Sequence, residues 1–211
     1  MLRCMPELAI DAEGLSRRYG RRWALIDVSL RVPAGSVVMI AGRNGSGKST
    51  LLRVLATAIR PDLGRAKVAG FDLLSHRQDV RNATALLSHD SYLYEALTAR
   101  ENLEIVRREN VMSILQRVSL ADRADDPVST FSAGMRKRLS FARVLMQDPK
   151  VVFLDEPYGQ LDPDGAAMVD EVVRDLKSRG VAVLMATHQL ERVGRIADQS
   201  LTLEMGRVVR P

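Results

Sequence analysis

Three short, almost unbroken runs of apolar residues mark the chain at 36–41, 151–154 and 181–186. The apolar residues in these runs do not alternate with polar ones, which is typical of parallel strands that are buried on both faces. Between the second and third runs the apolar positions instead recur with helical spacing, at Val169, Val172, Val173 and Leu176. Strands that alternate with helices in this way predict an α/β domain with a mostly parallel sheet.

The segments outside these runs have other patterns. Residues 7–41 consist of short β-like segments separated by turn signals, so we expect an antiparallel β part near the N-terminus. Residues 90–149 lack strand-like runs, and a capping box opens a helix at Thr98. A second helix is predicted at about 132–147. We therefore predict a single domain over residues 1–211 that contains a helical insertion at about 90–149.

Composition and charge narrow the function classes only slightly. Among 211 residues, 46% are hydrophobic and 27% are charged, which argues against disorder. The net charge of +5 suits nucleic acid, an anionic membrane surface or phosphate ligands, but the basic residues are scattered along the chain. The single cysteine, Cys4, excludes an internal disulfide. The N-terminal residues do not resemble a signal peptide, and no apolar run approaches the ~20 residues of a spanning helix, so we expect no intrinsic membrane span.

A phosphate-binding loop is predicted at residues 42–50, which match the pattern G-x-x-x-x-G-K-[ST]. The loop follows the first apolar run and precedes a predicted helix at 51–59. Its glycines allow backbone N–H groups to point at a phosphate chain, and the positive end of the helix adds to this attraction. Lys48 supplies a charge for the β- and γ-phosphates of ATP, and Ser49 supplies a hydroxyl for Mg²⁺. The predicted nucleotide-binding residues of the loop are Gly42, Arg43, Asn44, Gly45, Ser46, Gly47, Lys48, Ser49 and Thr50.

Two carboxylates, Asp155 and Glu156, follow the second apolar run. An acid at the end of a buried strand lies beside the phosphate loop in doubly wound sheets, so Asp155 is a candidate Mg²⁺ ligand. Glu156 would face the attacking water as a general base. A solvated or helix-capping acid pair is the alternative. Together the two motifs predict a P-loop NTPase that uses Mg²⁺ and no more, because kinases, helicases and GTPases share them.

A second anion site is predicted at Ser132, Ala133 and Gly134, where small residues open a helix. A plain serine helix cap is the alternative. The triplet resembles the signature L-S-G-G-Q of ABC transporter ATPases, with Ala133 in place of a glycine and Met135 in place of the glutamine. Further marks of that family follow in its usual order along the chain, at Tyr19, Gly159–Asp162 and His188.

The resemblance to ABC ATPases implies roles for these residues. Tyr19 would stack on adenine, Gly159–Asp162 would form the D-loop, and His188 would contact the γ-phosphate as a catalytic switch residue. The signature triplet would bind the nucleotide of a second copy, because one chain needs only one phosphate cradle for its own nucleotide. We therefore expect a head-to-tail ATPase dimer with two ATP molecules at its interface.

The resemblance also implies a membrane partner. In this family an integral membrane transporter subunit docks near the Q-loop, so Leu93, Tyr94 and Leu97 are candidates for the contact, with packing inside the helical insertion as the alternative. We expect the ATPase to be peripheral, at the cytoplasmic face of the inner membrane.

Four features resemble the ATPase of the cytochrome c maturation system, the haem exporter. His89 stands where the family has the Q-loop glutamine, and it would act as a catalytic ligand to Mg²⁺ or the attacking water. The signature has its S-A-G form, Gln189 follows His188, and the chain ends soon after Gly206 without a regulatory domain. We therefore expect this ATPase to energise haem export or haem-chaperone release in c-type cytochrome biogenesis.

Three alternatives remain open from the sequence. One is the ATPase of another ABC exporter, with a drug, lipid or peptide as cargo. Another is a soluble ABC ATPase that acts on DNA or ribosomes, which the single phosphate loop and the lack of a heptad run disfavour, so we expect no direct nucleic acid contact. The third is a small-molecule P-loop kinase.

Overall fold

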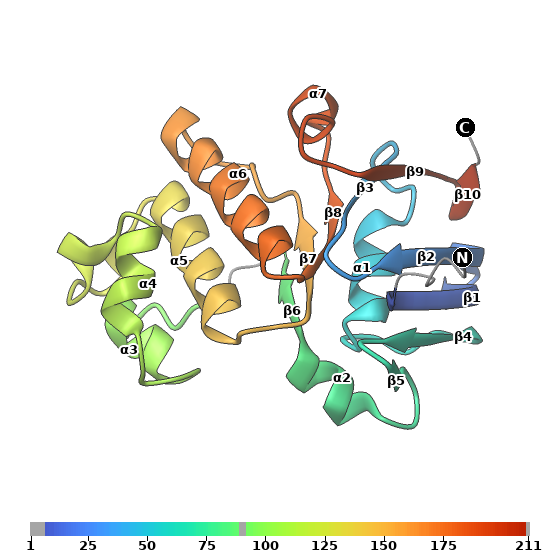
Figure 1. The fold of residues 1–211 in the computed structure, drawn as a ribbon, viewed down its shortest axis with the longest axis horizontal. Coiled ribbons are helices and arrows are strands. Elements are labelled where there is room, and N and C mark those ends of the chain that lie inside the picture. The colour runs from blue at the N-terminus through green and yellow to red at the C-terminus, as the bar shows by residue number, and fades with distance from the viewer. Residues whose placement is uncertain (1–6, 89–91, 210–211) are drawn as a thin grey trace, which may run out of the picture.

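The computed structural model describes residues 7–88 and 92–209, which form two sheets and a helical part. Figure 1 shows the smaller sheet at one end of the molecule and the helical part at the other, with the central strands of the larger sheet between them. The smaller sheet is antiparallel, in the order β2-β1-β4-β5, as predicted near the N-terminus. Its strands are β1 (Leu8–Tyr19), β2 (Arg22–Pro33), β4 (Leu63–Val68) and β5 (Phe71–Asp72).

The larger sheet has the order β10-β9-β3-β8-β7-β6, and only β10 runs antiparallel to its neighbour. The three apolar runs are confirmed as its central strands, β3 (Val37–Ala41), β7 (Val151–Asp155) and β8 (Ala182–Ala186). The outer strands were not predicted, because they are short or carry many polar residues. They are β6 (Thr84–Leu87), β9 (Gln199–Glu204) and β10 (Arg207–Val209).

Both faces of the central strands are buried, which explains why their apolar residues do not alternate with polar ones. Val38, Ile40 and Phe153 pack on the side of the small sheet and of α1 (Lys48–Leu55). Residues of the opposite face, such as Met39 and Leu154, pack against the helices α5 (Ala133–Met146) and α6 (Pro163–Ser178). The prediction of a helix at 51–59 was wrong at both ends. The helix starts at Lys48 and ends at Leu55, before Thr57 adopts a left-handed φ of 59°.

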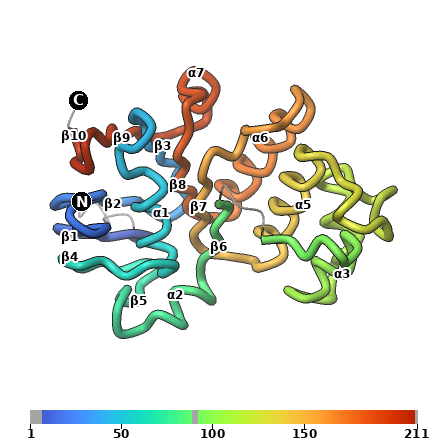
Figure 2. The backbone as a smooth tube through the Cα atoms, turned by 180° about the vertical axis from the view of Figure 1, so that it is seen from behind, coloured from blue at the N-terminus to red at the C-terminus, as the bar shows by residue number. Residues whose placement is uncertain are grey.

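The helical part lies between β6 and β7 in the sequence, as predicted. Seen from behind, β6 leads from α2 (Arg77–Ala83) toward this part (Figure 2). The expected capping box is present, because the Thr98 hydroxyl accepts a hydrogen bond from the N–H of Glu101 (3.1 Å) and the Glu101 carboxylate accepts one from the N–H of Thr98 (2.8 Å). The remaining helical elements are α3 (Ala99–Glu104), α4 (Val111–Arg117), η1 (Ala121–Arg123), η2 (Val128–Thr130) and, after β8, α7 (Leu190–Val193). Within the described residues, no helix combines the length and apolar character that crossing a membrane requires.

Candidate nucleotide site

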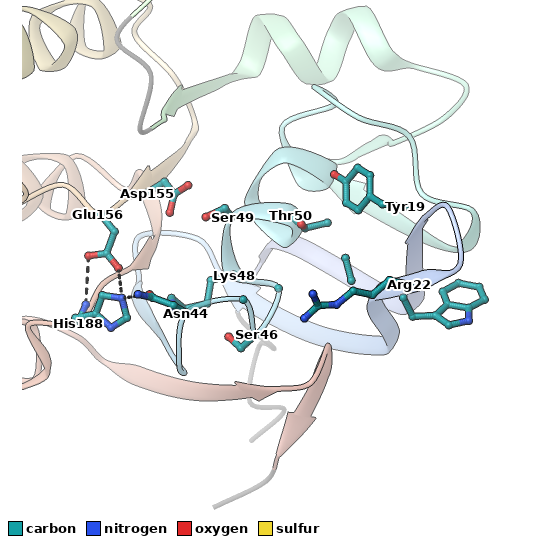
Figure 3. Close-up of a pocket in the computed structure, with 14 residues that line it drawn as sticks. Tyr19, Arg22, Asn44, Ser46, Lys48, Ser49, Thr50, Asp155, Glu156 and His188 are labelled. Carbon is teal, nitrogen blue, oxygen red and sulfur yellow. Dashed lines mark hydrogen bonds and ion pairs between the residues drawn. The ribbon is translucent and has the colours of Figure 1, made fainter.

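A cavity of about 450 Å³ lies where the phosphate loop meets the ends of β7 and β8 and the turn between β1 and β2 (Figure 3). It brings together most of the residues that the sequence predicts. The lining residues are Tyr19, Arg22, Trp23, Ala24, Asn44, Gly45, Ser46, Gly47, Lys48, Ser49, Thr50, Asp155, Glu156 and His188.

Two glycines of the phosphate loop are required by its close packing. A Cβ atom on Gly42 would lie 2.3 Å from the carbonyl oxygen of Leu203, and one on Gly47 would lie 2.5 Å from that of Ala24. Both glycines also have positive φ angles, of 142° and 110°. The loop can therefore lie against β9 and β2 only with glycine at these positions.

The side chain of Lys48 lies along the inside of the loop. Its ammonium group donates hydrogen bonds to the carbonyl oxygens of Gly42 (2.8 Å) and Arg43 (3.3 Å), so these two predicted residues serve the lysine through their backbones. Ser46 is 5% exposed, and its hydroxyl has no hydrogen-bond partner among the described residues. A buried, unpaired hydroxyl in the wall of this cavity fits a ligand with hydrogen-bonding oxygens.

The turn between β9 and β10 supports the loop from behind. The N–H of Gly206 donates to the carbonyl oxygen of Ser46 (2.9 Å), and the carbonyl oxygen of Gly206 accepts from the N–H of Ile26 in β2 (2.7 Å). Gly206 therefore joins the phosphate loop to β2, a role that its place in the sequence does not reveal.

The two acids, Asp155 and Glu156, line the cavity where β7 ends. Asp155 ends β7, where its backbone pairs with Ala186 of β8, and it is 4% exposed. Its carboxylate makes no hydrogen bond or ion pair with a side chain among the described residues. A buried carboxylate facing the hydroxyl of Ser49 is a donor set of hard oxygens, which suits Mg²⁺. Glu156 follows with a left-handed φ of 46° and is held by a hydrogen bond from its N–H to the carbonyl oxygen of Ala186 (2.8 Å).

His188 lies between the acid pair and the phosphate loop (Figure 3). Its Nε2 donates to the amide oxygen of Asn44 (2.7 Å) and lies 3.1 Å from Oε1 of Glu156. The N–H of His188 donates to the other carboxylate oxygen of Glu156 (3.3 Å). Apart from this 3.1 Å contact with Nε2, Oε1 makes no hydrogen bond among the described residues, so it is the carboxylate oxygen that could accept a proton from a water molecule.

The cavity extends past the phosphate loop to three side chains of the β1–β2 turn. Tyr19 is 47% exposed at the end of β1, and the guanidinium of Arg17 lies 5.1 Å from the centre of its ring. The guanidinium of Arg22 points toward the phosphate loop in Figure 3 and makes no hydrogen bond or ion pair among the residues that the structure describes, although the Arg22 backbone pairs with Tyr19. The sequence prediction missed Arg22 and Trp23, which follow Tyr19 by three and four positions and belong to no motif.

The electrostatic surroundings of the acid pair include a lysine of α5 that the sequence prediction also missed. Burial lowers the pKa of Lys137, and the negative charges of Asp155 and Glu156 oppose this shift. The helix that the signature triplet opens therefore brings a positive charge to the acids of its own chain.

Comparison with known proteins decides the family, because residues 25–159 match the model of the ABC transporter family. This chain belongs to the ABC transporter family. It is 40% identical to the daunorubicin resistance ATP-binding protein DrrA3 of Streptomyces coeruleorubidus, over 97% of the chain and 68% of that protein. It is 36% identical to the daunorubicin/doxorubicin resistance ATP-binding protein DrrA of Streptomyces peucetius, over 97% of the chain and 65% of that protein. The chain thus spans about two thirds of the length of these relatives.

A solved structure of the ATP-binding subunit of an ABC transporter has the same fold, with a TM-score of 0.88 and 27% identity over 95% of this chain and 88% of that one. The fold class and the ATPase activity predicted from the sequence are therefore confirmed, and the chain is an ABC ATPase that binds and hydrolyses ATP. Family membership also excludes the small-molecule kinase alternative.

The signature triplet of this ABC ATPase does not line the cavity of its own chain. Ser132 and Ala133 are exposed at the start of α5, and Ser132 caps the helix by accepting a hydrogen bond from the N–H of Met135 (3.2 Å). Gly134 packs against the D-loop, because a Cβ atom there would lie 3.1 Å from the carbonyl oxygen of Gln160. The cap is therefore present, and the exposed face of the triplet remains free for a ligand from outside the chain.

The predicted docking residues differ in their exposure. Tyr94 is 55% exposed, whereas Leu93 is partly buried against the core. Buried Asn102 holds this segment in place, because its amide oxygen accepts from the N–H of Tyr94 (2.9 Å) and its amide nitrogen donates to the Tyr94 carbonyl (3.0 Å). His89, the predicted Q-loop residue, lies outside the described residues.

Proposed function

We propose that this ABC ATPase hydrolyses ATP at the interface of a dimer and thereby energises an exporter of drug-like small molecules. The observation that carries the ATP site is one cavity that holds the phosphate loop, Asp155 and the Glu156–His188 pair but leaves the signature triplet outside. The cargo class is supported by the relatives named above for resistance to daunorubicin and doxorubicin. This is the drug-exporter alternative that the sequence left open.

In this proposal the phosphate chain of ATP lies in the loop, where backbone N–H groups and Lys48 bind its oxygens. The ammonium of Lys48 exchanges its contacts with the loop carbonyls for the β- and γ-phosphates. Ser49 and Asp155 would hold Mg²⁺, which would supply positive charge to the phosphate oxygens. Tyr19 stacks on the adenine ring at the other end of the cavity, a contact worth roughly 1–3 kcal/mol per base.

The hydrolysis step uses the pair at the ends of β7 and β8. Glu156 accepts a proton from the attacking water through its carboxylate, as the oxygen of the water bonds to the γ-phosphorus and the bond to ADP breaks. His188 exchanges its hydrogen bond with Asn44 for one to the γ-phosphate, because Nε2 already faces the cavity. The ring then orients the γ-phosphate toward the water that Glu156 activates.

The dimer proposal predicts that a Glu156→Gln variant binds ATP but does not hydrolyse it. We expect this variant to elute as a dimer in gel filtration with ATP and Mg²⁺, and as a monomer without nucleotide. Adding Ser132→Arg should abolish the dimer, because the new side chain would collide with the nucleotide of the other copy. A monomeric Glu156→Gln protein that hydrolyses ATP at the wild-type rate would contradict both the proposed base and the composite site.

Haem export, which the sequence predicts chiefly from His89, receives less support. Neither relative reported above is named for haem. The test compares a host strain that lacks this protein with its parent. We expect the deletion strain to accumulate more daunorubicin, with normal haem attachment to c-type cytochromes, and Glu156→Gln not to restore the parental level. Loss of haem attachment with unchanged drug accumulation would favour the haem exporter.

The membrane partner and the location are also part of the proposal. An exposed Tyr94 on a segment fixed by Asn102 gives a rigid apolar contact point beside the helical part. We propose that an integral membrane subunit docks there and holds the ATPase at the cytoplasmic face of the inner membrane, and that nucleic acid is not a partner.

A further inference from the structure

A mostly buried carboxylate joins the two loops that carry Glu156 and His188. Asp170 lies in α6, and its side chain is 14% exposed. Its Oδ1 accepts a hydrogen bond from the hydroxyl of Tyr158 (2.9 Å), and both of its oxygens accept from Nε of Arg192 (3.1 and 2.9 Å). A second nitrogen of Arg192 lies 2.8 Å from Oδ2. Tyr158 follows Glu156 by two positions, and Arg192 follows His188 by four.

The three side chains form a closed cluster, in which each member contacts the other two. The guanidinium of Arg192 lies 5.3 Å from the centre of the Tyr158 ring, within the range of a cation–π contact. Tyr158 is 3% exposed, and burial together with the hydrogen bond to Asp170 raises the pKa of its hydroxyl. The hydroxyl therefore stays protonated and remains a donor to the carboxylate.

The loop that carries His188 is attached at its start by the contacts of His188 with Asn44 and Glu156 and further along by α7. It continues into α7, a helix of only four residues, which is too short to be stable by itself. Within α7, Val193 is fully buried in the core, and Arg192 makes the ion pair. Beside this loop lies a second cavity of about 750 Å³, lined by residues of α6 and of the segment from His188 to Arg195. The side of the loop that faces this cavity lacks packed neighbours among the described residues, and there the ion pair between Arg192 and Asp170 links the loop to α6.

We infer that Asp170 is a positioning residue for ATP hydrolysis, which holds the loops after β7 and β8 so that Glu156 and His188 meet at one point of the cavity. Asp170 itself does not line the nucleotide cavity, so it acts through Tyr158 and Arg192. The inference rests on the proposed roles of Glu156 and His188. Because the reacting groups of a hydrolase must be held within a fraction of an ångström, loss of this link should slow the chemical step while leaving ATP binding intact.

The test compares Asp170→Asn and Arg192→Ala with wild-type protein. We expect kcat for ATP to fall about tenfold or more, whereas KM and the dissociation constant of a fluorescent ATP analogue change by less than about twofold. Arg192→Lys should recover part of the lost kcat, because a lysine can still pair with Asp170. Arg195→Ala is the matched control, since Arg195 is an exposed arginine of the same second cavity, and its kcat should be unchanged.

The double variant Asp170→Asn/Arg192→Ala separates positioning from two independent effects. If Asp170 and Arg192 act as a unit, the kcat of the double variant should be no lower than the kcat of the less active single variant. Unchanged kcat in the single variants, or a fall in ATP affinity equal to the fall in kcat, would overturn the inference.

Glu156→Gln is measured in the same assay. If that variant hydrolyses ATP normally, the proposed site itself fails, whereas an inactive Glu156→Gln beside fully active Asp170 variants refutes only the positioning role.

Discussion

The support of the phosphate loop by Gly206 leads to a quantitative prediction for Gly206→Ala. Gly206 has a φ of 80°, and a Cβ atom there would lie 2.8 Å from the carbonyl oxygen of Ala24 and 3.1 Å from its carbonyl carbon. Gly70 is a matched control, because its φ is 84° and no atom lies within 4 Å of the position of its Cβ. The two substitutions therefore share the left-handed backbone strain and differ in the collision.

The strain shared by both variants costs roughly 1–2 kcal/mol. The collision in Gly206→Ala adds about 1–3 kcal/mol, because the atoms that it meets belong to the backbone of β2 and cannot rotate away. For a domain of this size, each kcal/mol lowers Tm by about 2–4 °C. Gly206→Ala should therefore melt about 2–12 °C below Gly70→Ala.

The same variants test the link to nucleotide binding. The N–H of Gly206 is a hydrogen-bond donor to the carbonyl oxygen of Ser46, so a shifted turn should distort the phosphate loop and weaken ATP binding. Gly70 lies outside the cavity lining, and Gly70→Ala should bind ATP like the wild type. Differential scanning calorimetry and titration with a fluorescent ATP analogue measure the two effects. Equal melting temperatures and equal ATP affinities for both variants would refute the reasoning.

The remaining predictions concern the adenine end of the cavity and the membrane contact. Arg22→Ala should weaken ATP binding by about threefold to tenfold, the effect of one lost hydrogen bond. Arg21→Ala, outside the cavity lining, should not weaken it. Equal affinities for the two variants in a nucleotide titration would exclude the contact. Tyr94→Arg should reduce co-purification with the membrane subunit and spare ATP binding, while Met112→Arg, at another exposed apolar site of the helical part, should leave co-purification unchanged. A normal yield of the complex with Tyr94→Arg would count against docking at this segment.

Much of the fold was predictable because its main signals are local in the sequence. The central strands are apolar over their whole length, and the phosphate loop needs its glycines and lysine within a few positions of one another. The edge strands carry no such signal. β6 has only four residues and β9 alternates exposed and buried positions incompletely, so their place beside β7 and β3 depends on tertiary packing.

The residues of the candidate site also differ in whether a local motif reveals them. Lys48, Asp155 and Glu156 were found from contiguous motifs, and Tyr19 and His188 from the resemblance to ABC ATPases that starts at the signature triplet. Arg22 carries no motif and was missed. The cargo prediction depended on single residues such as His89, whose identity says little about a molecule that a different subunit would bind.

The sequence by itself determined that this protein has a phosphate loop followed by an acid pair on a buried strand, because these groups are adjacent in the chain. Only the tertiary structure decided which distant residues complete the site. It pairs His188 with Asn44 across 144 positions, sets Gly206 behind Ser46, and joins the loops after β7 and β8 through Asp170. Such contacts arise from the order of strands in the sheet and from the packing of α6 and α7 beside it, which no short segment of sequence encodes.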